Sequence, residues 1–152
     1  MRIEEEIKQA KFKNEYQKLQ INVLFTASWL NQQTTQLLKP YKISWQQFNI
    51  LRILRGRHPE PATVKVLASR MIDKTSNASR LVEKLRQKGY VERSECQEDR
   101  RRVDIILTEL GMQIVNEASD RLEEKLQEKL TQISEEEAQL ASDILDRMRG
   151  EE

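Results

Sequence analysis

Cysteine and histidine are almost absent from this sequence. Of the 152 residues, one is a cysteine, Cys96, and one is a histidine, His58. A lone cysteine excludes an intrachain disulfide framework and suits a reducing compartment, so we expect a cytoplasmic protein. A lone histidine leaves no pair for a metal site or a catalytic triad. Because His58 precedes Pro59, we expect it to be a loop or cap residue.

Long apolar runs and glycine-rich loops are also missing. No segment approaches the roughly 20 apolar residues that a membrane-spanning helix needs. The N-terminal stretch MRIEEEIKQAKFKNEY lacks the apolar core of a secretory signal. The four glycines form no phosphate-binding loop, and no nucleophile has a base at motif spacing. We therefore expect neither a membrane protein nor an enzyme, and no metal or cofactor.

Charged residues are abundant and unevenly distributed. Hydrophobic residues make up 38% of the chain and charged residues 34%, so the chain is poor in apolar side chains and rich in charge. Residues 65–102 carry eleven Lys/Arg and six Asp/Glu, a balance of +5, whereas residues 108–152 carry five and thirteen, a balance of −8. A basic middle beside an acidic tail fits two solvated surfaces and equally a nucleic-acid-binding face.

Apolar periodicity predicts a mainly α chain with one small β-hairpin. Two segments alternate like strands, YVERSEC and VDIILT, with QEDRRR as the turn between them. Ser44 with Gln47 and Ser134 with Glu137 form capping boxes at two helix starts. The expected helices run from about 5 to 38, from Ser44 to near Gly56, from Thr63 through Met71, from about Thr75 to Lys88, from Thr108 to about 131, and from Ser134 to near Gly150.

Residues 63–88 predict a helix-turn-helix, because a short amphipathic helix is followed by a tight turn and a second amphipathic helix. The second helix has an apolar stripe and an opposite face of short polar and basic side chains. Asn, Ser and Arg can reach base edges, and Lys can hold phosphates. An ordinary solvated helix would also be polar there, so the helix alone favours neither interpretation. The residues on this opposite face or flanking it are Ser76, Asn77, Ser79, Arg80, Glu83, Lys84 and Gln87.

Three consecutive arginines occupy the predicted hairpin turn, beyond the end of the second helix. A helix-turn-helix followed by a hairpin makes a winged helix, and Arg100, Arg101 and Arg102 suit a narrow, electronegative minor groove. Asp99 is expected to pair with a neighbouring arginine and fix the shape of the turn. The helices and the hairpin together favour DNA binding over a solvated surface.

The run DKTSNASRLVEKLRQKGYVERSECQEDRRRVDIILTELG resembles the MarR family of bacterial winged-helix transcription regulators. The likeness lies in S-R-L-V-x-x-L-x-x-K-G-Y-V, in the D-R-R wing and in the closing L-T-x-x-G, and it is tightest over about residues 63–111. The resemblance implies that Arg101 enters the minor groove and that Asp99 orients it. It also implies these contacts to double-stranded DNA: Ser76, Asn77, Ser79, Arg80 and Lys84 in the helix, with Arg100 and Arg102 as further wing contacts.

The long terminal helices carry apolar seams that need a partner. Some of this surface packs within the chain, but a chain with 38% hydrophobic residues has little core to cover both ends. We predict a homodimer, which the MarR resemblance also implies. Residues 1–40 and 109–152 would form the helical dimerisation region, and residues 41–108 the winged helix-turn-helix DNA-binding domain. Two recognition helices about 34 Å apart would read a pseudo-palindromic operator.

Five aromatic residues are candidates for an effector pocket: Phe25, Trp29, Tyr41, Trp45 and Phe48. Members of the resembled family often bind small aromatic or phenolic effectors between the dimer helices and the DNA-reading part. Core packing is the simpler role for each of these residues. Cys96 lies in the hairpin, whereas the reactive cysteine of some members lies in the first helix region. We therefore interpret Cys96 as incidental.

Two functions fit these patterns, and a third does not. The first is a sequence-specific DNA-binding transcription regulator, of repressor type, released by a small effector. The alternative is a winged-helix module that binds an acidic protein partner without specific DNA binding. Ser76, Asn77 and Arg80 favour the first, because a protein-docking face would more often expose aromatic residues or leucines. An enzyme acting on small molecules lacks its catalytic residues.

Overall fold

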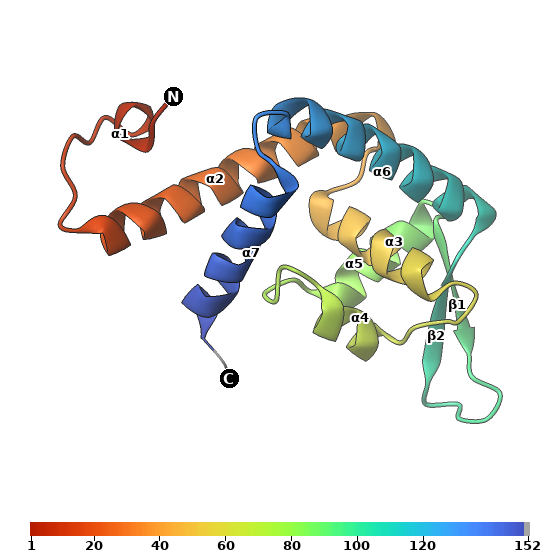
Figure 1. The fold of residues 1–152 in the computed structure, drawn as a ribbon. Helices are drawn as coiled ribbons and strands as arrows, with labels where there is room; N and C mark the ends of the chain where they lie inside the picture. The colour runs from red at the N-terminus through yellow and green to blue at the C-terminus, as the bar shows by residue number, and fades with distance from the viewer. Residues whose placement is uncertain (151–152) are drawn as a thin grey trace. The chain divides into compact units, whose positions relative to one another are not determined.

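The computed structural model describes residues 1–150 and confirms a mainly helical chain with one antiparallel hairpin (Figure 1). It forms two units, Met1–Ala118 and a second that begins at Ser119. Within residues 1–150, no helix combines the length and apolar content needed to cross a membrane. The elements are α1 Ile3–Glu6, α2 Glu15–Leu38, the 3-10 helix η1 Lys39–Tyr41, α3 Trp45–Arg57, α4 Val64–Arg70, α5 Ala78–Gln87, β1 Val91–Glu95, β2 Val103–Leu107, α6 Glu109–Leu130 and α7 Glu135–Arg149.

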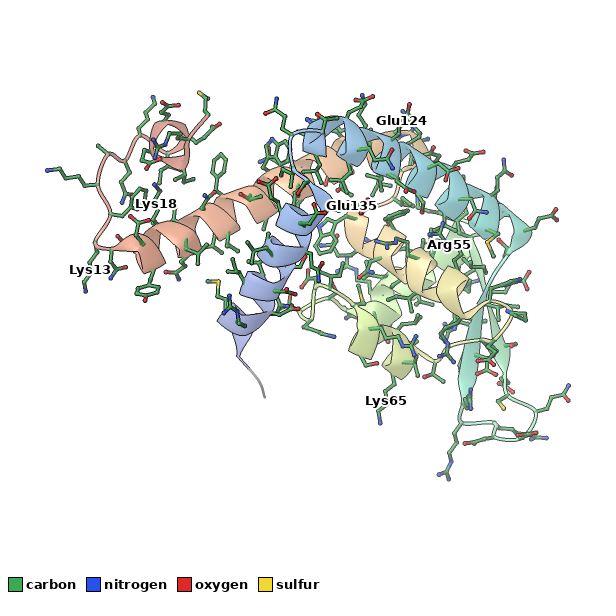
Figure 2. The ribbon with its side chains drawn as sticks, viewed as in Figure 1. Lys13, Lys18, Arg55, Lys65, Glu124 and Glu135 are labelled. Atoms are coloured by element: carbon green, nitrogen blue, oxygen red, sulfur yellow. The ribbon has the colours of Figure 1, made fainter. Side chains whose placement is uncertain are left out.

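The first long helix starts later than its periodicity predicts. Asn14 has extended backbone and its side chain accepts a hydrogen bond from the N–H of Gln17 at 2.9 Å, so α2 begins at Glu15. The preceding segment folds back instead of continuing the helix. Lys18 Nζ lies 2.5 Å from Glu4 Oε1 (Figure 2), and this hydrogen bond lowers the pKa of Glu4. The prediction of one continuous helix from residue 5 was therefore wrong over residues 7–14, which lie between α1 and α2.

The starts of α3, α4 and α7 follow the capping patterns of the sequence. Ser44 and Gln47 form a complete capping box, as do Ser134 and Glu137. Thr63 Oγ1 accepts a hydrogen bond from the N–H of Val66 at 3.2 Å. His58 is the C-cap residue of α3, as expected.

The core of the first unit joins α3, α4 and α5 to the base of the hairpin. Arg55 extends this packing to the start of α6, because its guanidinium donates to the carbonyl of Val115 at 3.4 Å and to Asn116 Oδ1 at 3.2 Å (Figure 2). The largest fully buried side chains are Leu38, Ile50, Leu51, Leu54, Leu67, Met71, Val82, Leu85, Val91, Ile105 and Val115.

The hairpin, residues 91–107, is the wing of this fold. Its register pairs Val91 with Leu107 at the base and Glu95 with Val103 at the far end. Ile105 also bridges to Ala62, with N···O distances of 2.8 and 3.0 Å, so the loop before α4 pairs with β2. Only the base of the wing is buried, and its loop, residues 96–102, extends beyond the helices (Figure 1).

The L-T-x-x-G sequence holds the end of β2 against the residues that follow α5. Thr108 Oγ1 donates to the carbonyl of Gly89 at 2.6 Å and accepts from the N–H of Gly111 at 3.0 Å. Gly111 is buried, and a Cβ at this position would overlap the carbonyl oxygen of Tyr90. Gly89 has φ of +77°, a left-handed conformation that glycine adopts without steric cost. These contacts explain why a glycine is needed in the first turn of α6.

The second unit contains the later part of α6, a short turn and α7. No residue of α7 is buried in this chain, although the helix is amphipathic. The exposed large apolar side chains of this unit are Leu126, Leu130, Ile133, Leu140 and Met148.

Candidate nucleic-acid interface

The turn between α4 and α5 is held by polar side chains of α3 and of the turn itself. Asn49 is buried, and its Oδ1 accepts from the N–H of Ile72 at 2.9 Å. Asp73 Oδ1 accepts from the N–H of Thr75 at 3.0 Å and from its hydroxyl at 2.6 Å. The hydroxyl contact from Thr75 is the main reason that the pKa of Asp73 is lowered. This network fixes the point at which α5 begins.

Helix α5 presents a polar face outward, as its periodicity predicts. Ala78, Val82 and Leu85 are buried and hold the opposite face against the core. The outer side chains Ser79, Arg80 and Lys84 are all exposed.

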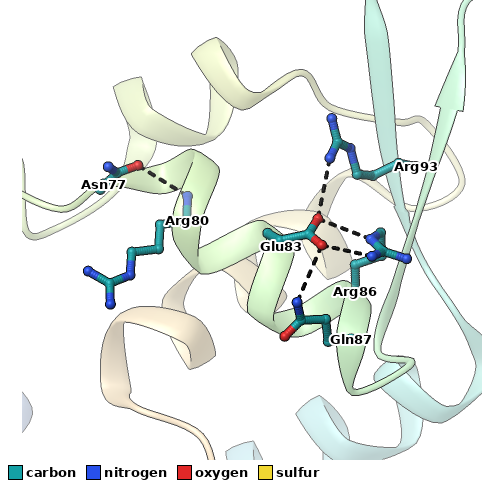
Figure 3. Close-up of polar contacts among 6 residues, drawn as sticks. All are labelled: Asn77, Arg80, Glu83, Arg86, Gln87 and Arg93. Atoms are coloured by element: carbon teal, nitrogen blue, oxygen red, sulfur yellow. Dashed lines mark hydrogen bonds and ion pairs between the residues drawn. The ribbon is translucent and has the colours of Figure 1, made fainter.

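Asn77 is exposed too, but its side chain has a local task. Its Oδ1 caps the helix by accepting from the N–H of Arg80 at 3.1 Å (Figure 3). Asn77 is therefore the N-cap and α5 begins at Ala78, slightly later than the expected start at about Thr75.

Ser76 differs from the expected arrangement. Its hydroxyl oxygen is buried, and it contributes to lowering the pKa of Asp73. Ser76 precedes the N-cap, so helical spacing does not apply to it. The structure therefore does not place its hydroxyl on the outer face beside Arg80.

An open groove of about 420 Å³ lies at the N-terminal end of α5. Donor and acceptor groups from α3, the turn and α5 meet there, and two cations border it. This mixture suits an anionic ligand that also presents hydrogen-bonding edges. The lining residues are Gln46, Asp73, Thr75, Ser76, Asn77, Arg80, Leu81 and Lys84.

The three arginines of the wing loop have different surroundings. Asp99 Oδ1 accepts from the backbone N–H of Arg101 at 3.0 Å, so it orders the backbone rather than the guanidinium. Arg102 Nε lies 2.9 Å from Asp104 Oδ1 and forms an ion pair along the strand. Arg100 and Arg101 are both exposed. The side chains of this loop extend away from the helices (Figure 2).

A carboxylate on α5 joins the helix to the wing, a contact that the sequence pattern did not predict. Glu83 accepts from Arg86 at 2.7 and 3.0 Å and from Arg93 of β1 at 3.3 Å (Figure 3). The hydrogen bond from Arg86 is the main cause that lowers the pKa of Glu83 to about 2. The spacing of Glu83 and Arg86 was a visible signal in the sequence. The contact with Arg93 depends on how the hairpin packs.

The five aromatic candidates do not gather into one described cavity. Phe48 is buried in the core, whereas Phe25, Trp29, Tyr41 and Trp45 are half-buried. A hollow of about 660 Å³ along α2 is lined by other side chains, including Leu24, Asn31 and Thr35. Within residues 1–150, no cluster of three or more His, Cys, Asp or Glu residues is suited to hold a metal ion.

Residues 43–103 match the model of the MarR family. The chain is 33% identical over 104 residues to the HTH-type transcriptional regulator PecS of Dickeya dadantii, covering 67% of this chain and 62% of PecS. It is 31% identical over 80 residues to the HTH-type transcriptional regulator SarZ of Staphylococcus haemolyticus, covering 53% of each chain. The matched region thus spans less than two thirds of either relative.

Several solved structures share the fold. A MarR-like transcription regulator from Bacillus cereus has a TM-score of 0.77 at 20% identity, covering 89% of this chain and 96% of that one. The MepR–DNA complex of S. aureus has a TM-score of 0.76 at 24% identity, covering 91% and 97%. A MarR family protein from Bacillus stearothermophilus gives 0.71 at 25%, covering 92% and 96%. The MarR family match runs from two residues before α3 to the first residue of β2, so it covers the helix-turn-helix and the first strand of the wing.

Proposed function

We propose that this protein is a sequence-specific DNA-binding transcription regulator. Helix α5 would lie in a major groove, and the wing would reach the adjacent minor groove. One observation carries the proposal: the exposed outer face of α5 and the exposed arginines of the wing loop belong to one unit with a shared buried base. PecS and SarZ are named as transcriptional regulators, and MepR was solved as a complex with DNA.

The proposed contacts divide by chemistry. Arg80 and Ser79 would reach base edges, and Lys84 would hold a phosphate. Asn77 uses Oδ1 for the helix cap, so its Nδ2 group would be the donor to DNA. Arg101 would enter the minor groove, with Arg100 beside it.

We further propose a homodimer that reads a pseudo-palindromic operator. Residues 1–40 and 109–152 would form the dimerisation region, and residues 41–108 the DNA-binding domain. Both terminal regions expose large apolar side chains: Tyr16 is 82% exposed, Leu24 64% and Leu140 57%. A second copy would cover such side chains and would place two α5 helices about 34 Å apart.

Repression in the bacterial cytoplasm is the proposed mode of action. PecS and SarZ are named as transcriptional regulators, and a repressor of this kind would act by occupying its operator. A small aromatic effector would release it by binding among Phe25, Trp29, Tyr41 and Trp45, which are half-buried and therefore partly accessible.

Selection of bound fragments from genomic DNA, followed by gel-shift titration at rising salt, tests the proposal. We expect one enriched two-fold-symmetric motif and an affinity that falls steeply with salt, because binding releases counterions from phosphates. Arg80→Ala should reduce discrimination between the motif and random DNA, whereas Arg101→Ala should weaken binding to both. Arg147→Ala in α7 removes the same charge from the acidic segment and serves as the control.

Two results would reject the proposal. One is the absence of any enriched motif. The other is binding by the Arg80 and Arg101 variants that equals binding by the parent. Either result would favour a module that binds an acidic protein partner.

A further inference from the structure

We propose that Glu83 is a positioning residue that fixes the wing to α5 and so sets the spacing between the two DNA-contacting elements. This inference rests on the proposed function. It adds a residue whose effect on DNA binding passes through Arg93 rather than through contact with DNA.

The geometry of the Glu83 carboxylate links the two elements directly. Its Oε2 atom accepts from Arg93 of β1 at 3.3 Å and from Arg86 Nε at 3.0 Å. Its Oε1 atom accepts from Arg86 at 2.7 Å, with Gln87 Nε2 at 3.5 Å (Figure 3). One carboxylate therefore holds one cation of the helix and one of the wing strand.

The negative charge of Glu83 is itself unfavourable for DNA binding, so a structural role would explain its presence at this position. Glu83 stands in the basic segment, next to Lys84 and one turn after Arg80. A carboxylate there repels phosphates, and an isolated exposed ion pair contributes little to stability. Several donors on one carboxylate, however, stabilise its ionised form, and the pKa of Glu83 is lowered to about 2, chiefly by the hydrogen bond from Arg86.

The other contacts described between the wing and α5 lie nearer the base of the wing. The N–H of Tyr90 donates to the carbonyl of Leu85 at 3.0 Å, and the side chain of Val91 is buried. The residues from Glu92 to Glu95 are exposed. Arg93 thus ties the exposed part of β1 to α5. A strand advances about 3.3 Å per residue, so a small rotation at Arg93 displaces the wing loop by a larger distance.

The first test compares Glu83→Gln with Glu92→Gln on the selected operator duplex, at fixed salt. Both changes remove one negative charge, and Glu92 is an exposed residue of β1, the strand that carries Arg93. General electrostatics predicts tighter binding for both. We expect Glu92→Gln to bind as tightly as the parent or tighter, and Glu83→Gln to bind roughly three- to ten-fold more weakly.

The second test is a double-mutant cycle with the wing loop. Arg101→Ala should cost less affinity in the Glu83→Gln background than in the parent, because a misplaced wing has less contact to lose. Arg80→Ala should reduce operator affinity by the same factor in both backgrounds. Arg93→Ala should match Glu83→Gln, and combining the two should add no further loss. A general loss of stability would leave these effects additive, and thermal unfolding of each variant measures that loss separately.

The outcomes separate this inference from the proposed function. If the parent binds a specific duplex and Glu83→Gln binds it equally well or better, the positioning role is wrong and the regulator remains. Full additivity of Glu83→Gln with Arg101→Ala would also reject the positioning role alone. If the parent selects no DNA, the proposed function fails and the positioning role falls with it.

Discussion

Among the four glycines, Gly111 is the one at which packing leaves no room for a Cβ. The Cβ of an alanine would meet the carbonyl oxygen of Tyr90, and Leu107 Cδ2 lies 3.2 Å from the same point. The obstacle is backbone, so it cannot rotate away. Helix propensity favours alanine by about 1 kcal/mol, and the overlap outweighs this gain.

We predict that Gly111→Ala lowers the free energy of unfolding by about 1–3 kcal/mol. Gly56 in α3 is the matched control, because a Cβ there meets nothing within 4 Å. Gly56→Ala should instead stabilise the protein by about 0.5–1 kcal/mol. Urea unfolding of both variants measures the difference. Equal stability of the two variants would contradict the proposed overlap.

Asn77 combines a cap and a proposed DNA contact, and two substitutions separate them. Asn77→Ala should cost about 1 kcal/mol of stability because it removes the acceptor for the N–H of Arg80. Asn77→Ser keeps a capping oxygen but lacks the amide donor. We expect this variant to unfold like the parent and to discriminate less well between operator and random DNA. Retained discrimination would assign Asn77 to capping alone.

At the scale of elements, the wing loop is expected to act through selected arginines. Arg102 is paired with Asp104, whereas Arg101 is exposed and has its backbone ordered by Asp99. Arg101→Ala should therefore reduce the slope of log affinity against log salt by about 1, as expected for one lost phosphate-region contact. Arg102→Ala should change the slope less. Gel-shift titrations at several salt concentrations measure both slopes, and a larger change for Arg102 would reverse the assignment.

Capping residues and apolar periodicity predicted most helices and strands. The features that they did not predict depend mainly on contacts between residues distant in the sequence. The capping boxes at Ser44 and Ser134, and the alternating segments of the wing, correspond to observed elements. The start of α2 was misplaced because the apolar pattern continues across residues 5–14 while Asn14 caps the helix. The pairing of Ala62 with Ile105 carries no local signature, since each residue alone is typical of a loop or a strand.

Helical periodicity predicted the exposed side chains correctly for residues within α5, but not for residues before its cap. Arg80 and Lys84 lie within it, and the periodicity of 100° per residue placed them correctly on the exposed side. Ser76 precedes the cap, so its buried hydroxyl follows from the turn geometry instead. The contact between Glu83 and Arg93 joins residues ten positions apart across a helix exit and a strand, which periodicity cannot relate.

For the whole molecule, the exposed apolar side chains predict association. Leu140 of α7 is 57% exposed and Leu126 of α6 is 44% exposed. We predict that Leu140→Glu shifts the protein from dimer to monomer, because it places a charge in an apolar contact. Light scattering after size-exclusion chromatography measures the mass, and operator affinity should fall with it. Ile72→Glu is the control, since Ile72 is 71% exposed but lies in the α4–α5 turn. A monomeric parent would contradict the dimer.

The contacts of Thr108 and Gly111 also limit where residues can be inserted into or deleted from this chain. Inserting or deleting one residue between Leu107 and Gly111 would separate Thr108 from Gly89 and move the glycine off the Tyr90 carbonyl. The loop at the opposite end of the wing does not pack against neighbouring backbone in this way, because its side chains are largely exposed. We therefore expect residues 96–102 to tolerate loops of different size and sequence while the scaffold stays unchanged, so exchange of this loop would change the proposed groove contact alone.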